Sequence, residues 1–209
     1  MTIFEHAALG ATVALAVCAQ RSAGWAIVGM AAVAGALADW DGLSLLFGQA
    51  AFARVHRVWG HNLLVASVSG AFVGGLGYLC RQSLSAQKLA RRFWPEPIAV
   101  EQPAFVIRRL VLWIVMGVLA ALSHLPADIV FSGHPEMRSW PVPIYWPFSE
   151  DGWVWPLVAW GDPVPTLIFV VAMFALFRWR THGQAVALAT LVCVHVYLII
   201  RWLTGGVGP

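Results

Sequence analysis

Long apolar stretches separated by short polar segments dominate the pattern of this chain. A membrane-spanning helix needs about 20 predominantly apolar residues, with about 17 as the lower end, and six runs meet or approach that length. They are Ile3 to Gln20, Ala23 to Ala38, Asn62 to Cys80, Leu110 to Pro126, Val164 to Phe177, which could extend backward to Val154, and Gln184 to Ile200. The pattern predicts an all-α, polytopic membrane protein with about five to six transmembrane helices in one bundle.

The composition supports the same class. Of the 209 residues, 60% are hydrophobic and 11% are charged, whereas a soluble domain carries about 45–50% apolar and about 25% charged residues. A soluble globule of this size could not bury so much apolar side chain, and a disordered chain would not contain it. The sequence lacks a convincing internal repeat, so we expect a single transmembrane domain over residues 1–209.

The small positive charge does not indicate a nucleic-acid partner. The net charge is +3, and the thirteen Lys and Arg residues are scattered between apolar runs rather than gathered on a basic helix. The three cysteines, Cys18, Cys80 and Cys193, lack the spacing of metal ligands, so we interpret them as packing residues. The N-terminus has no basic region of the kind that begins a cleaved signal peptide, so the first run is expected to remain as a membrane helix.

The basic residues predict the orientation. If six helices alternate in direction, nine basic residues fall on the side opposite the N-terminus and four on the N-terminal side. The positive-inside rule assigns the richer side to the cytoplasm. Residues 81–109 then form a basic cytoplasmic loop, and residues 127–153 form an extracytoplasmic loop rich in Trp and Pro. The nine are Arg21, Arg81, Lys88, Arg91, Arg92, Arg108, Arg109, Arg178 and Arg180; the four are Arg54, Arg57, Arg138 and Arg201.

Acidic residues and histidines gather at the helix ends on the extracytoplasmic side. Ionisable residues in or near a membrane span cost free energy and usually mark function. Carboxylates alone would repel one another, but imidazoles mixed with carboxylates are a set that a divalent cation neutralises. We therefore predict eight metal-ligand candidates on this face: His6, Asp39, Asp41, His56, His61, His124, Asp128 and Asp162.

The spacing of these residues sets conditions on the local structure. His124 and Asp128 are four apart and share one face if the helix continues that far, although Pro126 could kink or end it. Asp39 and Asp41 are two apart and would point away from each other on a continuous helix. A helix end or a turn at this point would bring both carboxylates to one centre.

The order and spacing of these elements resemble a known family, the membrane-bound, metal-dependent hydrolases of the inner membrane that belong to the damage-response regulon. The resemblance spans roughly residues 5 to 166. Its elements in this chain are Glu5-His6, Leu37-Ala38-Asp39-Trp40-Asp41, His56-Arg57-Val58-Trp59-Gly60-His61-Asn62, Ser123-His124-Leu125-Pro126-Ala127-Asp128, Trp146-Pro147-Phe148-Ser149 and Asp162-Pro163.

The chain keeps the ligand-type residues of this family and changes their neighbours. Ala38 replaces a proline, and Val58, Gly60 and Asn62 replace a glycine, a threonine and a serine. Groups around metal ligands orient them, so the resemblance implies a shared metal more strongly than a shared substrate. It also implies residence in the inner membrane and hydrolase activity.

Eight ligand candidates predict two divalent ions bridged by one carboxylate, with Asp41 or Asp128 in that role. Zinc suits the histidine content, while manganese or iron would also fit. Two such ions would hold the attacking and leaving oxygens of a phosphoryl displacement. Arg57 could clamp a phosphate oxygen or, alternatively, bind lipid headgroups at the interface. An aspartate that does not bind metal could act as general base. The predicted catalytic residues are therefore Asp41, Asp128 and Arg57.

The position of the cluster predicts its substrate. A site at helix ends that is ringed by tryptophans faces lipid headgroups, which favours a phosphoester of a lipid or lipid-linked substrate; an ester or amide would meet the same metals. Membrane lipids are the only other partners that we predict. The tryptophans are Trp140, Trp146, Trp153 and Trp155.

Two other functions remain open. In one, the metal only staples the helices of a structural or assembly subunit in a larger membrane complex. In the other, the protein transports metal ions or protons, which would require polar residues that continue across the bilayer. His195 is the one ionisable residue in mid-helix, so transport is the less favoured alternative.

Overall fold

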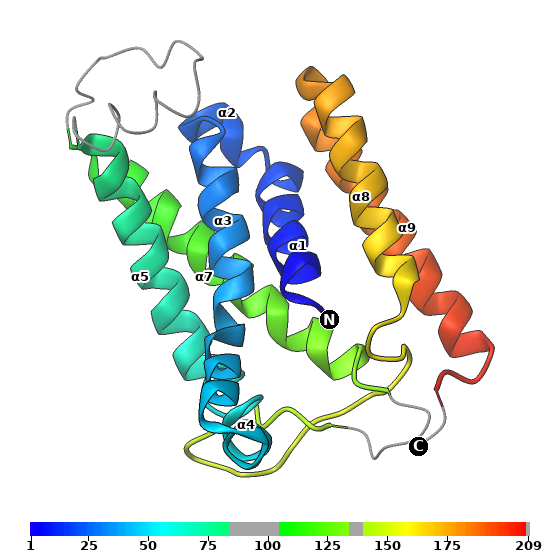
Figure 1. Cartoon of the computed structure of the whole chain (residues 1–209). Coiled ribbons are helices and arrows are strands. Elements are labelled where there is room, and N and C mark those ends of the chain that lie inside the picture. The colour runs from blue at the N-terminus through cyan, green and yellow to red at the C-terminus, as the bar shows by residue number, and fades with distance from the viewer. Residues whose placement is uncertain (84–104, 134–139, 208–209) are drawn as a thin grey trace.

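The structure is a bundle of helices arranged along one common direction (Figure 1). It is a computed structural model that describes residues 1–83, 105–133 and 140–207. The elements of these residues are α1 (Ile3–Ala16), α2 (Ala19–Ala23), α3 (Ala26–Leu37), the 3₁₀ helix η1 (Ala38–Phe47), α4 (Gln49–Val55), α5 (Leu63–Gln82), α7 (Ile107–Val130), α8 (Pro163–Arg178), the 3₁₀ helix η2 (Arg180–His182) and α9 (Gly183–Leu203).

Four segments within the described residues are long and apolar enough to cross a membrane. They are Ala26–Phe47, Leu63–Gln82, Ile107–Val130 and Arg180–Leu203, and the two shorter apolar helices are α1 and α8. Each of the six predicted runs therefore contains a helix. The predicted all-α polytopic membrane fold is confirmed.

One predicted helix boundary is wrong, and one possible extension does not form. The first helix stops at Ala16, because the chain turns through Cys18 in a left-handed conformation (φ 58°) and begins the short helix α2. The fifth helix does not extend back to Val154. It begins at Pro163, because the side chain of Asp162 caps its first turn and a proline at the first position cannot donate a helical hydrogen bond.

The two predicted loops also change at their borders. Helix α7 continues through Pro126 to Val130, so residues 127–130 are helical, and the described residues 140–162 before α8 contain no helix. Most of the predicted basic loop, residues 84–104, lies outside the described residues, as do residues 134–139, which include Arg138.

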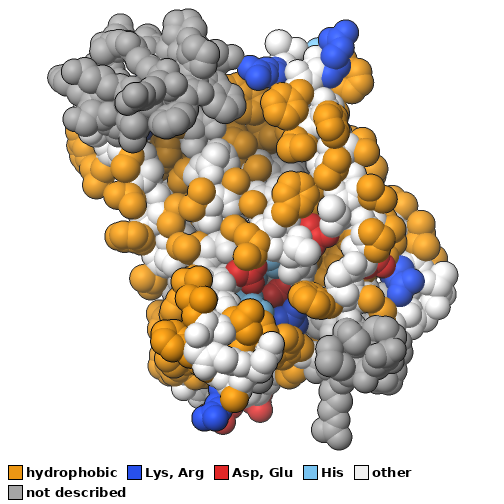
Figure 2. All heavy atoms as spheres, viewed as in Figure 1, with side chains coloured by type: hydrophobic (Ala, Val, Ile, Leu, Met, Phe, Trp, Pro, Cys, Tyr) orange, Lys and Arg blue, Asp and Glu red, His pale blue; other side chains and the backbone are white. Residues whose placement is uncertain are grey.

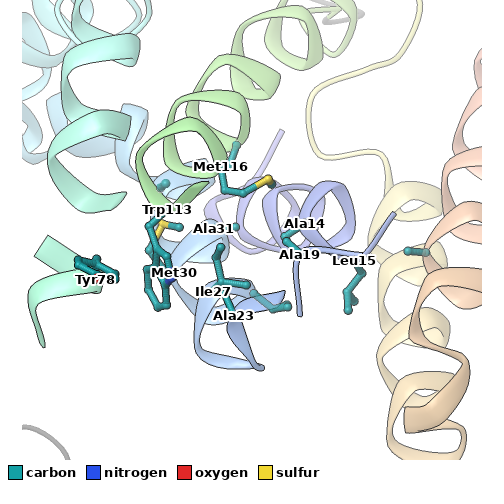
Figure 3. Close-up of a cluster of buried hydrophobic side chains, with 14 residues drawn as sticks. Ala14, Leu15, Ala19, Ala23, Ile27, Met30, Ala31, Tyr78, Trp113 and Met116 are labelled. Carbon is teal, nitrogen blue, oxygen red and sulfur yellow. The ribbon is translucent and has the colours of Figure 1, made fainter. Parts of the chain in front are cut away.

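Small residues allow the helices to pack closely. A Cβ at Gly74 of α5 would meet the Trp113 carbonyl oxygen of α7, and a Cβ at Gly10 of α1 would meet the Ala31 carbonyl oxygen of α3. Such contacts between small residues are typical of membrane helices. Large side chains fill the adjoining space in a buried cluster that joins α1, α3, α5 and α7, including Leu15, Ile27, Met30, Tyr78, Trp113 and Met116 (Figure 3).

The direction of the helices brings one set of termini to the same end of the bundle. The starts of α1, α5 and α8 and the ends of α7 and α9 lie toward the end that also carries η1 and α4 (Figure 1). This is the arrangement that the alternation of six helices predicts, and it places the polar helix ends together.

Candidate metal centre

Seven of the eight predicted ligands come together in two buried groups, and the donor atoms within each group lie within 4.8 Å of one another. The first group contains His6, Asp39, His124 and Asp128, and the second contains Asp41, His56 and His61. The groups also hold Asp41 and Asp128, two of the three residues for which we predict a catalytic role.

The geometry of α7 determines the first group. Because the helix continues past Pro126, His124 and Asp128 lie on the same face. The Nδ1 atom of His124 donates to the Gly35 carbonyl at 2.8 Å, which leaves the lone pair on Nε2. That Nε2 atom lies 3.5 Å from Asp128 Oδ2 and 3.6 Å from Asp39 Oδ1. A backbone carbonyl on the far ring nitrogen is a usual partner of a metal-binding histidine.

His6 brings the beginning of α1 to the same place. Its ring stacks on that of His124, with centroids 3.4 Å apart and an angle of 14°. Its Nε2 atom lies 3.0 Å from Asp128 Oδ1, and the Met1 amine lies 2.8 Å from the same oxygen. The Nδ1 atom of His6 is buried without a hydrogen-bond partner, so one ring nitrogen of the cluster is not used in a hydrogen bond.

The second group is built around Asp41, which the 3₁₀ turn of η1 places against the loop before α5. Asp41 Oδ1 accepts from His56 Nδ1 at 2.8 Å, and Oδ2 accepts from His61 Nδ1 at 3.1 Å and from the Gly60 amide at 2.9 Å. His61 is fully buried. Asp39 and Asp41 therefore approach His61 from its two different ring nitrogens, since Asp39 Oδ1 lies 3.3 Å from His61 Nε2.

Asn62 fixes the loop that carries both histidines. Its Oδ1 atom accepts from the Val65 amide and caps α5, while its Nδ2 atom donates to the carbonyls of Val58 and Trp59. Asn62 is fully buried, so it supports the loop and does not face a substrate. Its sequence signal is the Asn directly before an apolar run, which is a typical helix cap.

Arg57 points into the protein. It is 3% exposed, its Nη1 atom donates to Ser132 Oγ at 3.0 Å and to the Trp140 carbonyl at 2.8 Å, and its guanidinium lies 5.2 Å from the Trp140 ring centroid. Its Nε atom is buried without a hydrogen-bond partner, 3.7 Å from Asp128 Oδ2. The alternative role in binding lipid headgroups at the interface is not supported, because the side chain does not reach the surface.

Asp162 lies outside both groups, unlike the sequence prediction. Its two oxygens accept from the Val164 amide at 2.9 Å and from the Tyr197 hydroxyl at 2.6 Å, so it caps α8 and joins α8 to α9.

His195 is also apart from the cluster, on an exposed face of α9, where its Nδ1 atom donates to the Leu191 carbonyl at 2.7 Å.

The electrostatics of the cluster favour a cation. Burial by itself lowers the pKa of His61, but the carboxylates of Asp128, Asp39 and Asp41 raise this pKa to about 10. Three buried carboxylates around one imidazole therefore hold a positive charge strongly. Imidazole and carboxylate donors, with a spare His6 nitrogen among them, fit zinc, manganese or iron.

The apolar spans and the buried Asp and His cluster at one end of the bundle define a multi-pass membrane protein with the composition of a metal centre. The family model described as YdjM inner membrane protein matches residues 1–206. The chain belongs to this family of inner membrane proteins, which confirms the inner-membrane part of the resemblance. No curated protein and no solved structure matches the chain.

Proposed function

We propose that this protein is a metal-dependent hydrolase that acts on a phosphoester of a lipid or lipid-linked substrate. The observation that carries the proposal is the convergence of His and Asp donor atoms from α1, η1, the loop before α5 and α7 in two adjoining groups. A divalent ion held there would supply Lewis-acid activation of water and of a phosphoryl oxygen. The residues that would hold it are Asp39, His61, His124 and Asp128.

Protein groups around the cluster have distinct tasks in this proposal. Among these four residues Asp39 is the most accessible, with 11% of its side chain exposed, so water and substrate would reach the centre on its side. Arg57 adds a fixed positive charge next to Asp128, with its Nε atom 3.7 Å from Asp128 Oδ2 and without a hydrogen bond. An anionic substrate and its developing charge would both be stabilised by that guanidinium.

The surroundings favour a lipid over a soluble substrate. Figure 2 shows acidic, histidine and basic side chains gathered at one place within a largely hydrophobic surface, between α4 and α8. Trp40 and Trp59 are close in sequence to the candidate ligands, and their side chains are 39% and 46% exposed. A polar head could enter from the bilayer at this place while its chain remained in contact with apolar side chains.

We also propose that this face is extracytoplasmic. The count of nine basic residues against four supports that orientation. The burial of Arg57 beside Asp128 strengthens this assignment. A buried arginine that is paired with a carboxylate does not count as a basic loop residue, so three basic residues remain on this side.

The experiment is a hydrolysis assay on purified protein in detergent, with lipid phosphoesters and matched water-soluble phosphoesters as substrates. We expect release of phosphate or alcohol that a chelator abolishes and zinc or manganese restores, with Asp128→Asn inactive. Hydrolysis that persists in chelator would contradict the metal-dependent mechanism, and a metal-loaded protein without hydrolysis would contradict the enzyme.

A structural role for the metal is the second candidate. It is favoured by the near-complete burial of His61, His124 and Asp128, each at most 2% exposed, because a closed four-ligand site is typical of structural zinc. In that case a chelator would lower the melting temperature without any hydrolytic activity to lose.

A further inference from the structure

His61 faces both groups of candidate ligands, and its two ring nitrogens have different neighbours. The Nδ1 atom meets Asp41 Oδ2 at 3.1 Å. The Nε2 atom lies 3.0 Å from Asp128 Oδ2, 3.3 Å from Asp39 Oδ1 and 3.0 Å from His124 Nε2. The imidazole therefore connects the two groups, and the question is which of them it would serve as a ligand.

The distances on the Nε2 side match a single metal ion. The atoms concerned are Asp39 Oδ1, His61 Nε2, His124 Nε2 and Asp128 Oδ2. Apart from the distance between the two carboxylates, the five distances that join these atoms are 3.0–3.6 Å. Donor atoms about 2.0–2.1 Å from a tetrahedral zinc are separated by roughly 3.3 Å. These five distances thus match the spacing between ligand atoms around a single metal ion.

The Nε2 atoms of His61 and His124 are also placed to share such an ion. Both imidazoles use Nδ1 to donate, to Asp41 and to the Gly35 carbonyl respectively. Two neutral imidazoles in this state present facing lone pairs at 3.0 Å, which repel unless a proton or a metal lies between them. A metal that binds the neutral imidazoles would remove that repulsion and satisfy both nitrogens together.

Asp41 has little left to offer a second ion. Its two oxygens already accept three hydrogen bonds, from His56, His61 and the Gly60 amide. This is the arrangement of a carboxylate that orients a metal-binding histidine through the far nitrogen of its ring. His56, 15% exposed, holds the other oxygen of the same carboxylate and stacks on Phe52.

We infer that Asp39, His61, His124 and Asp128 form one four-ligand centre, and that Asp41 and His56 position His61 rather than bind a second ion. This inference rests on the proposed metal dependence and replaces the two-ion arrangement that the number of ligand candidates predicted. Asp41 is then a positioning residue, and its removal weakens the centre without removing a ligand.

The test counts ions rather than turnover. The full-length protein is purified in detergent, stripped with chelator and titrated with Co²⁺, with visible absorption and elemental analysis as readouts. We expect one equivalent in the unaltered protein. Asp41→Asn should still bind one equivalent, with the same absorption bands and about 10–100-fold lower affinity. His56→Gln should also keep one equivalent, and Asp151→Asn, an exposed carboxylate, should match the unaltered protein.

The possible results separate the alternatives. Two equivalents that fall to one in Asp41→Asn or His56→Gln would overturn the inference, as would unchanged affinity in Asp41→Asn. If Asp41→Asn does not fold, the ion count of His56→Gln decides alone. Failure of the unaltered protein to bind any ion overturns both this inference and the proposed metal dependence. One ion bound as expected, with no hydrolysis of phosphoesters, contradicts only the proposed enzyme.

Discussion

Gly60 packs directly against the backbone carbonyl of Ala38, so closely that a Cβ at residue 60 would overlap the carbonyl oxygen. This contact joins the loop before α5 to the start of η1. It also brings the Gly60 amide to 2.9 Å from Asp41 Oδ2. A glycine at this position is therefore a condition for the Asp41 and His61 pair to form.

The first prediction follows from that contact. Gly60→Ala should push the loop away from η1, weaken Co²⁺ or Zn²⁺ binding at least tenfold and lower the free energy of unfolding by about 2 kcal/mol, as overpacking of a tight site does. Gly29→Ala in α3 is the matched control, since a Cβ there meets nothing within 4 Å and alanine favours a helix. Isothermal titration and thermal unfolding measure both effects. Equal metal affinity in the two variants would contradict the prediction.

The sequence could predict the helices and most of the candidate ligands because both signals are local. An apolar run of sufficient length must become a membrane helix, and polar residues at its end have few structures available to them. The alternation of six helices then brings those ends to one side. The positions of His6 in the first group and His61 between the groups depend on this arrangement and on the side-chain packing around each ring.

Other features depend on contacts between distant residues and have no local signal. Asp162 lies at the start of a helix, as several candidate ligands lie near helix ends, but its carboxylate accepts a hydrogen bond from Tyr197 of another helix. Arg57 stands in a polar loop, yet its left-handed backbone (φ 64°) carries the side chain inward to Ser132 and Trp140. The Met1 amine beside Asp128 likewise follows only from the folded arrangement.

The second prediction concerns Asp128, the carboxylate that contacts three histidines. Asp128→Asn keeps the volume but removes the negative charge, so bound metal should fall to less than about one tenth of the unaltered content. Val130→Ala in the same helix turn should keep its metal and lose only packing. Elemental analysis after gel filtration measures both. A fully metallated Asp128→Asn protein would remove this residue from the ligand set.

The third prediction concerns orientation. In a variant whose three cysteines are replaced by alanine, a cysteine introduced at the exposed Glu150 should react with an impermeant maleimide in intact cells. A cysteine at Thr181, exposed between α8 and α9, should react only after the membrane is permeabilised. The reverse pattern would place the candidate metal centre on the cytoplasmic side.

The fourth prediction concerns pH. In the metal-free protein the pKa of His61 is raised to about 10 from its ordinary 6.5, so its protonation stabilises the folded state below about pH 6.5 and this stability is lost as the pH rises through 10. The melting temperature in chelator should therefore fall between pH 7 and 10. Zinc requires the neutral imidazole, so the gain in melting temperature on adding zinc should grow over the same range. A metal-free protein that becomes more stable toward pH 10 would contradict this.

The last prediction separates the two features of Arg57, its buried charge and its backbone conformation. Arg57→Ala removes the hydrogen bonds to Ser132 and Trp140 and leaves Asp128 without its neighbouring guanidinium, which should cost about 3 kcal/mol of unfolding free energy. Arg57→Gly loses the same contacts but fits a positive φ, so it should be more stable than the alanine variant by about 1 kcal/mol. Denaturant titration in mixed micelles measures the unfolding free energy of both variants. Equal values for the alanine and glycine variants would show that the left-handed backbone carries no strain.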